Sequence, residues 1–323
     1  MKLAEIYLEL KHDIDLIEQE LERSVIASSN TLTEASTHIL KAGGKRLRPI
    51  LVLLGGQFGD YQIEELKHIA VPLELVHMAS LVHDDVIDDA DLRRGKPTIK
   101  AKWDNRVAMY TGDFIFGQAV EIATHFKNPE IHLLLANVMF EMSIGEVEQI
   151  RDQYNWEQNL RVYLRRIRRK TALLIAVSCK LGALAANAER AIQRNLYEFG
   201  YNVGMSFQIT DDILDFVGTE KQLGKPAGSD LLQGNLTVPA LYAMHCHQHI
   251  KDMIYSKVSR EMNLETDMTE IINEIKQSGG IEYSLDLSDR YLKKALKALS
   301  SLPNIKAKTH LQQVAEYIGK RKF

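Results

Sequence analysis

Two aspartate clusters with the same internal spacing are the residues of this chain best suited to chemistry. The sequence reads DDVID at residues 84–88 and DDILD at residues 211–215. Apolar residues with helical periodicity lead into both clusters, and on a helix residues four apart project from the same face. The first and last aspartates of each cluster therefore share a face, where carboxylates repel each other unless a cation lies between them. Two such clusters predict a pair of acidic walls that face a common set of ions.

The cofactor expected at these clusters is Mg²⁺. Hard carboxylate oxygens favour this ion, which binds few carboxylates, keeps several waters and bridges to the phosphates of a substrate. The alternative is that each cluster is the solvated acidic end of a helix. Two copies, both approached through apolar residues, make that alternative the weaker interpretation.

Cationic residues supply the complementary charge that phosphates need. Residues 43–49 (GGKRLRP) place three cations behind two glycines at an expected helix start, where free backbone N–H groups attract anions. A solvated basic turn is the alternative for this segment alone. Arg93 and Arg94 follow the first cluster closely, and arginine binds phosphate oxygens in a bidentate manner. The order of acidic ladder, turn and paired arginines is that of a diphosphate–Mg²⁺ site.

Other polar residues lie at helical spacing from the clusters. Lys170 and Thr171 add a cation and a hydroxyl within an apolar helix, and Gln208 lies one turn before the second cluster. His77 shares a face with Asp84, because seven residues are close to two helical turns. For His77 the alternative is a hydrogen-bonded core histidine.

Two further clusters have simpler interpretations. The basic run at residues 165–170 predicts arginines on a solvated helix face, with an inward role kept for Lys170. The histidines in residues 245–249 include an i, i+4 pair suited to a soft metal, but no third ligand is near in sequence, so a surface location is expected.

Bulk composition excludes several classes of protein. A net charge of −3 argues against an electrostatic nucleic-acid binder, and no segment is long and apolar enough to span a membrane, so membrane contact is at most peripheral. Cys179 and Cys246 form no ligand spacing and fit a reducing cytosol, so a cytoplasmic location is expected. Charged residues such as Glu5 and Glu9 interrupt any apolar stretch near the first residue, so no signal peptide is expected.

Helical periodicity dominates the chain and predicts one all-α domain over residues 1–323. Neither a short repeat nor a Pro/Ser-rich linker divides it. Pro72 predicts a break or kink, and the glycine-rich segment 218–236 predicts a lid beside the second cluster. The expected helices cover residues 6–21, 30–41, 47–58, 63–89, 105–126, 129–151, 158–187, 189–217, 237–257, 266–277, 281–300 and 306–320.

Five segments between residues 43 and 236 resemble the trans-isoprenyl diphosphate synthases, in that family's order. They read GGKRLRP, LVHDDVIDDADLRRG, KT, FQITDDILD and GKPAGSDLLQGN. Each is moderately specific, and the five together are highly specific. The stretch HMASLVHDDVIDDADLRRGKPTIKAKW and the ending YIGKR are most similar to catalytic large subunits of two-component heptaprenyl diphosphate synthases.

The resemblance implies a single large helical bundle around a central cavity, the isoprenoid synthase fold. It implies an Mg²⁺-dependent prenyltransferase that adds isopentenyl diphosphate to an allylic diphosphate such as farnesyl diphosphate. The implied product is a long all-trans polyprenyl diphosphate, heptaprenyl (C35), for a menaquinone side chain, with hexaprenyl, octaprenyl or shorter products as alternatives. A small regulatory subunit is the implied partner, in a heterodimer.

The resemblance also assigns roles to individual residues. The catalytic residues would be Asp84, Asp88, Lys170 and Asp211. The Mg²⁺ ligands would be Asp84, Asp85, Asp88, Asp211 and Asp215. Contacts to the allylic diphosphate would come from Arg93, Lys170, Thr171, Gln208 and Lys225. Contacts to isopentenyl diphosphate would come from Lys45, Arg48, His77 and Arg94. Asn235 departs from the pattern, because many relatives carry a lysine there.

Product length is expected to depend on side chains just before the first cluster. Val76, Ala79 and Ser80 are small, so a growing prenyl chain would pass between the helices. Replacing Ala79 or Ser80 by Phe is expected to shorten the product.

Three other functions fit part of the sequence. The doublet His83-Asp84 resembles that of HD-type phosphohydrolases but leaves both aspartate clusters unexplained. A terpene cyclase would share the metal ligands without the cations for isopentenyl diphosphate. A non-catalytic prenyl-binding subunit is the alternative outside the enzymes, and its sign would be a degraded aspartate cluster.

Overall fold

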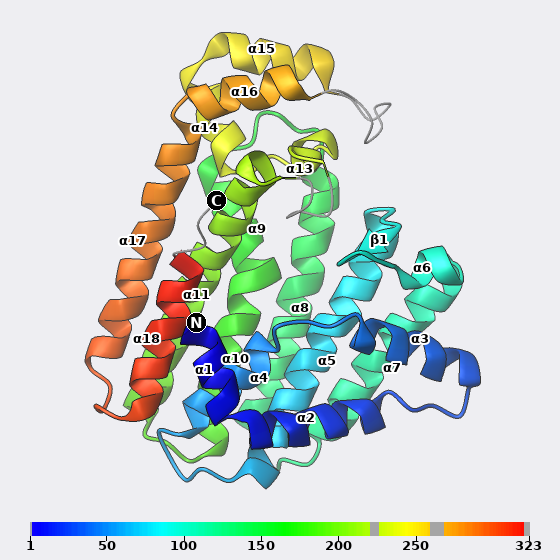
Figure 1. Ribbon diagram of the computed structural model, residues 1–323, viewed down its shortest axis with the longest axis vertical. Helices are drawn as coiled ribbons and strands as arrows, with labels where there is room; N and C mark the ends of the chain where they lie inside the picture. The colour runs from blue at the N-terminus through cyan, green and yellow to red at the C-terminus, as the bar shows by residue number, and fades with distance from the viewer. Residues whose placement is uncertain (1, 220–225, 259–267, 320–323) are drawn as a thin grey trace. The chain divides into compact units, whose positions relative to one another are not determined.

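The computed structural model describes residues 2–219, 226–258 and 268–319, and within these ranges the chain is almost entirely helical (Figure 1). The exception is a two-stranded antiparallel hairpin, β1 (Leu92–Arg93) and β2 (Lys96–Pro97). The all-α prediction is confirmed. No helix in the described ranges combines the length and the apolar composition that a bilayer span needs.

The chain divides into two compact units, each built from separated stretches. Unit 1 contains Met1–Met139, Leu174–Glu198 and Ser301–Val314. Unit 2 contains Phe140–Leu173, Phe199–Ser300 and Ala315–Phe323. The single domain and its central cavity stay predictions.

Unit 1 is organised around a long buried helix, α5 (Ile63–Ile87), which packs most extensively against α7. The helix α2 crosses both α4 and α5 (Figure 1). Further helices belong wholly to this unit: α1 (Lys2–Glu9), α2 (Lys11–Ser24), α3 (Asn30–Lys41), α4 (Leu47–Gly56), α6 (Ile99–Lys102) and α7 (Asn105–Ala123). Four helices lie partly in each unit: α8 (Pro129–Asp152), α10 (Leu173–Ala185), α11 (Arg190–Val217) and α18 (Lys306–Gly319).

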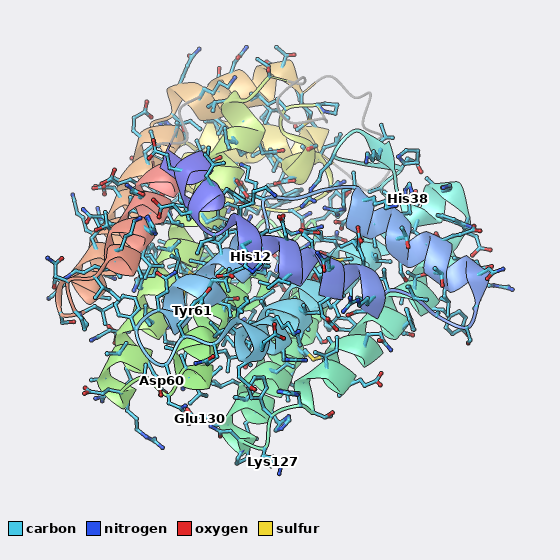
Figure 2. All side chains as sticks on the ribbon, turned by 60° about the horizontal axis from the view of Figure 1, so that its bottom comes forward. His12, His38, Asp60, Tyr61, Lys127 and Glu130 are labelled. Atoms are coloured by element: carbon cyan, nitrogen blue, oxygen red, sulfur yellow. The ribbon has the colours of Figure 1, made fainter. Side chains whose placement is uncertain are left out.

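The connection between α4 and α5 is held by hydrogen bonds to two segments that are distant in sequence. The Asp60 N–H donates to the carbonyl of Ala186 over 2.6 Å, and the Tyr61 hydroxyl donates to Asp13 Oδ2 over 2.5 Å (both labelled in Figure 2). These contacts fix where α5 begins, and therefore the position of the first aspartate cluster at the other end of this helix.

Unit 2 has its own apolar core, which includes the fully buried Tyr163 and Phe216. Ser288 of α17 bonds to Ser206 and Thr210 of α11 inside this core, so those two helices are joined by polar as well as apolar contacts. The other elements of the unit are α9 (Leu160–Ile167), the π-helical turn η1 (Arg168–Ala172), α13 (Ser229–Leu232), α14 (Val238–Cys246), α15 (Gln248–Lys257), α16 (Thr269–Gln277) and α17 (Gly280–Ser300).

Helix boundaries differ from the predicted ones at four places. The chain turns at Leu10, between α1 and α2, although the apolar stripe through this helix pair is buried as expected. Helix α5 continues through Pro72, so no break occurs there, because the residues around it are packed in the core. A π-helical turn interrupts the predicted helix 158–187. An extended residue, His247, divides the predicted helix 237–257 into α14 and α15.

Candidate active site

The first aspartate cluster lies at the C-terminal end of α5. Asp84 is in the last turn and Asp88 is the C-cap, whose N–H donates to the Asp84 carbonyl over 2.8 Å. Both side chains are half-buried. Carboxylates are unfavourable at a helix C-terminus, where the dipole is negative, and the last turn of α5 contains no basic residue. This end of α5 therefore concentrates negative charge at a place suited to a cation.

Asp85 points the other way and anchors the hairpin. It is buried, and one of its carboxylate oxygens accepts from Arg93 Nε over 2.8 Å and from Arg93 Nη2 over 2.7 Å. Burial raises the pKa of Asp85, against the lowering effect of Arg93. This mutual pairing competes with the predicted role of Asp85 as a metal ligand and with that of Arg93 as a diphosphate contact.

A group of cations with few acidic partners lies near this end of unit 1. Burial lowers the pKa of Arg48 to about 10, the charge of Glu74 opposes this effect, and the charge of Arg94 adds to it. The Arg48 Nε is buried without a hydrogen-bond partner among the described residues. Burial and the nearby charges of Arg48 and Arg94 lower the pKa of His77 well below its usual range, so its imidazole is neutral. Undercompensated positive charge of this kind favours a bound anion.

The neighbouring Arg46 has a different environment. Its guanidinium pairs with Glu18 over 2.5 Å and with the buried Glu74 over 3.2 Å. Of the cations in residues 43–49, Arg46 is therefore structural, and the roles predicted for Lys45 and Arg48 stay predictions. Lys45 is exposed in the loop before α4.

Backbone strain accompanies this cation group. Arg46, Asp89 and Arg94 have φ values of 42°, 51° and 53°, in the left-handed region that residues other than glycine rarely adopt. A Cβ at Gly44 would lie 2.9 Å from Arg94 Nη1, so glycine leaves room for that guanidinium. Strained residues of this type cluster at functional sites, where the surrounding structure holds them.

The second aspartate cluster lies in the last two turns of α11. Asp211 is half-buried, and Asp215 is buried. The Asp215 oxygens accept from the Ser229 hydroxyl over 3.0 Å and from the Asp230 N–H over 3.2 Å. Asp215 therefore fastens the short helix α13 to the end of α11, which competes with its predicted role as a metal ligand.

A hydrogen-bonded chain joins the second cluster to the π-helical turn. Thr171 Oγ1 donates to Gln208 Oε1 over 2.7 Å, Gln208 Nε2 donates to Asp212 Oδ1 over 2.9 Å, and the Tyr163 hydroxyl donates to Asp212 Oδ2 over 2.6 Å. Burial raises the pKa of Asp212 to about 7, and nearby Asp230 adds to the effect. Two residues predicted to contact the same diphosphate, Thr171 and Gln208, are thus in direct contact.

Lys170 is held from the facing helix α8. Its ammonium donates to Glu146 Oε2 and to Gln149 Oε1, both over 2.8 Å. An ammonium has three N–H donors, so one is left for a further acceptor. The inward role predicted for Lys170 is compatible with this arrangement.

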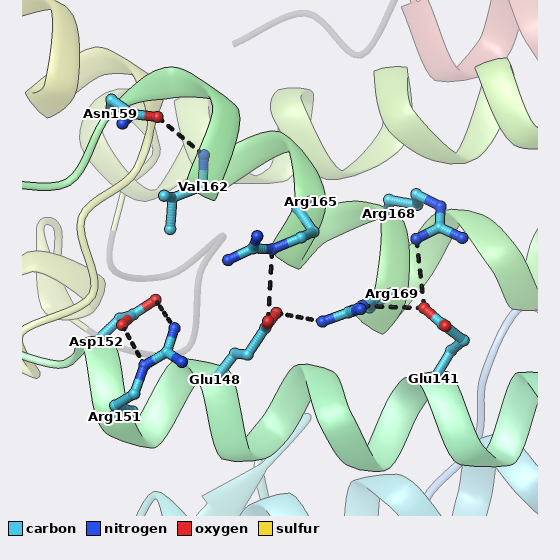
Figure 3. Close-up of polar contacts among 9 residues, drawn as sticks. All are labelled: Glu141, Glu148, Arg151, Asp152, Asn159, Val162, Arg165, Arg168 and Arg169. Atoms are coloured by element: carbon cyan, nitrogen blue, oxygen red, sulfur yellow. Dashed lines mark hydrogen bonds and ion pairs between the residues drawn. The ribbon is translucent and has the colours of Figure 1, made fainter.

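The prediction of solvated arginines in residues 165–170 is wrong for Arg166. This side chain is 6% exposed, donates to Gln158 Oε1 over 3.0 Å and to the Leu236 carbonyl over 2.5 Å, and lies beside the Tyr163 ring. The buried partners compensate its charge, which the sequence pattern alone did not reveal. The other arginines pair with glutamates of α8, as Figure 3 shows.

Replacing Arg166 by Ala is expected to lower the free energy of unfolding by about 3 kcal/mol, because buried hydrogen-bond acceptors lose their charged donor. The matched change Arg165→Ala removes an arginine that is 44% exposed and is expected to cost at most about 1 kcal/mol. Urea denaturation of both variants measures the difference. Equal costs would show that Arg166 is solvated after all.

The histidine-based alternatives find no support. His83 Nε2 lies 3.1 Å from the Met109 carbonyl and 3.4 Å from Asp113 Oδ1, so the ring contacts α7. His249 lies 3.0 Å from Glu274, in a different helix from His245 because of the interruption at residue 247. Within the described ranges, no three His, Cys, Asp or Glu side chains form a group able to hold a metal ion.

Several residues at the second cluster were missed by the sequence interpretation. Tyr163, Asp212 and Asp230 belong to its hydrogen-bonded network, and Glu146 holds Lys170. Asp212 and Asp230 stood inside quoted motifs, whereas nothing in the sequence pointed to the distant Tyr163 and Glu146. Asn235 is half-buried and its Oδ1 has no hydrogen-bond partner among the described residues. Lys225 lies outside the described residues.

Comparison with known proteins identifies the family. Residues 29–275 match the polyprenyl synthetase family model. The chain is 55% identical to heptaprenyl diphosphate synthase component 2 of Bacillus subtilis, over 100% of this chain and 92% of that one. It is 57% identical to the same component of Geobacillus stearothermophilus, over the full length of both. The chain belongs to the polyprenyl synthetase family. The phosphohydrolase alternative is thereby excluded.

Solved members of the polyprenyl synthetase family share this fold. Heptaprenyl diphosphate synthase of Staphylococcus aureus has a TM-score of 0.91 at 41% identity, covering 97% of this chain and 99% of that one. A polyprenyl synthase of Caulobacter crescentus, complexed with calcium and isoprenyl diphosphate, has a TM-score of 0.94 at 28% identity, covering 99% and 98%. The all-α fold of this chain is therefore that of isoprenyl diphosphate synthases.

Proposed function

We propose that this polyprenyl synthetase is the catalytic subunit of a heptaprenyl diphosphate synthase. It would add isopentenyl diphosphate units to an allylic diphosphate, farnesyl diphosphate being the expected primer, and release an all-trans C35 product for a menaquinone side chain. The observation that carries the proposal is the combination in unit 1 of a half-buried acidic helix end with a group of cations in which the buried Arg48 Nε has no hydrogen-bond partner among the described residues. The full-length similarity to component 2 enzymes supports the product.

The half-buried aspartates fit a hard divalent cation. Asp84 and Asp88 present carboxylates at a helix C-terminus, and Asp211 presents one near the end of α11. Mg²⁺ needs few protein carboxylates, because it completes its coordination with water and substrate phosphate. When bound, Mg²⁺ supplies the positive charge that neutralises a diphosphate leaving group. Asp85 and Asp215 would act chiefly by orienting the hairpin and α13.

The cations and the hydroxyl would bind the two diphosphates. Arg48, Arg94 and the neutral His77, assisted by Lys45, are proposed to hold isopentenyl diphosphate. Lys170 would use its remaining N–H on the allylic diphosphate, with Thr171 and Gln208 beside it and Lys225 and Arg93 as further proposed contacts. Fixed donors aimed at departing oxygens favour ionisation without solvent reorganisation. The new carbon–carbon bond then forms between the allylic carbon and the double bond of isopentenyl diphosphate, with loss of a proton.

A small partner subunit is proposed, because the two similar Bacillus and Geobacillus proteins are named as a component. The cytoplasm is the proposed location. A purified chain that makes full-length product alone at the rate of the mixture would contradict the partner proposal.

Product length is proposed to depend on the face of α5 just before the first cluster. Val76 and Ala79 are fully buried, whereas Ser80 is half-buried, and its hydroxyl donates to the His77 carbonyl over 2.8 Å. A Phe at residue 79 would overpack the core, which costs about 1–3 kcal/mol, so residue 80 is the cleaner test.

Ser80→Phe is expected to shorten the product by several isoprene units, because the larger ring would obstruct the growing chain. Chromatography of dephosphorylated products measures their length. The control is Leu81→Phe on the neighbouring face of the same helix, for which no shortening is expected. An unchanged product from Ser80→Phe would place the length-determining residues elsewhere.

The proposed function is tested with radiolabelled isopentenyl diphosphate, farnesyl diphosphate and Mg²⁺, with and without a candidate small subunit. Labelled C35 alcohol after dephosphorylation supports the proposal. Release of phosphate without label in the organic phase would overturn it.

A further inference from the structure

A π-helical turn interrupts the helix that carries Lys170 and Thr171. The chain is helical from α9 through α10, and the turn occupies Arg168–Ala172. A π-turn accommodates one extra residue, and each helical residue advances the side-chain direction by about 100°. The turn therefore decides which way Lys170 and Thr171 point, relative to an uninterrupted helix.

Two glycines make room for this turn. A Cβ at Gly145 of α8 would lie 3.0 Å from Arg169 Cβ and 3.3 Å from Lys170 Cγ. A Cβ at Gly204 of α11 would lie 2.6 Å from Ala172 Cα. The wider π-turn thus approaches both helices at positions where they have no side chain.

Ion pairs hold the turn against α8 on both sides of Gly145. Glu141, Gly145 and Glu148 share one face of α8, being four and three residues apart. Arg169 lies between the two glutamates, with Nε 2.9 Å from Glu141 and Nη1 2.6 Å from Glu148 (Figure 3). Arg168 and Arg165 reinforce the same pairs over 3.3 and 3.4 Å.

Lys170 is the side chain that this packing controls. Its stem lies against Gly145 while its ammonium reaches Glu146 and Gln149 of the same helix. A free lysine side chain carries about 2 kcal/mol of rotamer entropy, so a preset stem lowers the cost of placing the ammonium on a ligand.

We infer that Gly145 is a positioning residue that acts through Lys170, with Arg169 as its support. The inference rests on the proposed function, in which Lys170 contacts the allylic diphosphate. A methyl group at residue 145 displaces the Lys170 stem by a few tenths of an ångström. Affinity for the allylic substrate then falls, while the binding of isopentenyl diphosphate is unaffected.

The test is a double-mutant cycle on the full chain with its partner subunit. Gly145→Ala is expected to raise the KM for farnesyl diphosphate about tenfold, with the KM for isopentenyl diphosphate changed less than about twofold. In a Lys170→Met background the same change is expected to alter the farnesyl diphosphate KM less than about twofold, because the lysine through which Gly145 is proposed to act is absent. A purely structural role predicts equal effects in both backgrounds.

Gly117→Ala is the matched control. Gly117 lies within helix α7, and a Cβ there would meet nothing within 4 Å among the described residues apart from the helix's own backbone, so kinetics are expected to match the wild type. An effect of Gly145→Ala that is equal in both backgrounds, or absent, overturns the inference. Should Gly145→Ala fail to fold, Arg169→Gln takes its place in the cycle with the same two outcomes. If the wild-type protein formed no prenyl product at all, the proposed function itself would be refuted. That outcome is distinct from a failure of the inference about Gly145.

Discussion

Replacing Asp84 by Asn is expected to reduce turnover by about 10³-fold, the scale seen when one preorganised electrostatic group is lost from an active site. The change keeps the shape of the side chain and removes its charge from the end of α5. The proposed cation then loses one of its few protein ligands, and the diphosphate leaves without full charge compensation. Initial rates at saturating substrates measure the effect, with circular dichroism to confirm that the helices remain.

The matched control is Asp89→Asn, one residue beyond the cluster. The Asp89 side chain is 90% exposed and pairs with Lys100, whose side chain is 8% exposed, and asparagine tolerates the left-handed backbone of residue 89. Its activity is expected to stay within about twofold of the wild type, since Asp91 also lies 3.7 Å from the Lys100 ammonium and keeps it partnered. If Asp84→Asn retained comparable activity, Asp84 would have no place in the metal site.

Replacing Arg48 by Met is expected to lower kcat/KM for isopentenyl diphosphate by about 10²-fold, because each hydrogen bond to a charged group contributes about 1.5–3 kcal/mol. The KM for farnesyl diphosphate is expected to change little. Stability is expected to hold or rise, since the Arg48 Nε is buried without a hydrogen bond. Steady-state kinetics with each substrate varied in turn separates the two effects.

Arg46→Met is the contrasting variant, two residues away. It would leave the buried Glu74 without its ion pair, which is expected to cost about 3–5 kcal/mol of unfolding free energy. Opposite outcomes, with Arg48→Met unstable and kinetically normal, would assign the structural role to Arg48.

Local patterns predicted much of the fold and the grouping of the site. Periodicity located the long helices, including α5, because tertiary packing and the apolar stripe agree there. The predicted helices 63–89 and 189–217 placed both aspartate clusters near helix ends, as observed. The register of His77 related it only to Asp84, whereas the family resemblance grouped it with the cations, and the charges of Arg48 and Arg94 do reach its imidazole.

Features that depend on distant partners were not predictable from the sequence. The burial of Arg166 requires the Leu236 carbonyl, and the position of Lys170 requires two residues of α8. The π-helical turn was not predicted, because the room for it is left by Gly145 and Gly204, which lie on two other helices distant in sequence. The continuation of α5 through a proline likewise reflects tertiary packing that overrides local preference.

Functional strain is concentrated where the proposed substrates bind. Left-handed residues lie near the first cluster, carboxylates occupy a helix C-terminus, and the buried Arg48 Nε has no hydrogen-bond partner among the described residues. Each arrangement is unfavourable for folding alone and favourable once a cation and an anion are bound. The proposed function accounts for all three together.

The central proposal is that the carboxylates of the aspartate clusters make binding of the allylic diphosphate depend on Mg²⁺. Its most direct test is calorimetric titration of an unreactive farnesyl thiodiphosphate into the wild type, Asp84→Asn and Asp211→Asn, with Mg²⁺ and with EDTA. We predict binding by the wild type that depends on Mg²⁺, and a loss of that dependence in either variant. Equal affinity in EDTA, or an unaffected variant at either cluster, would contradict the proposal.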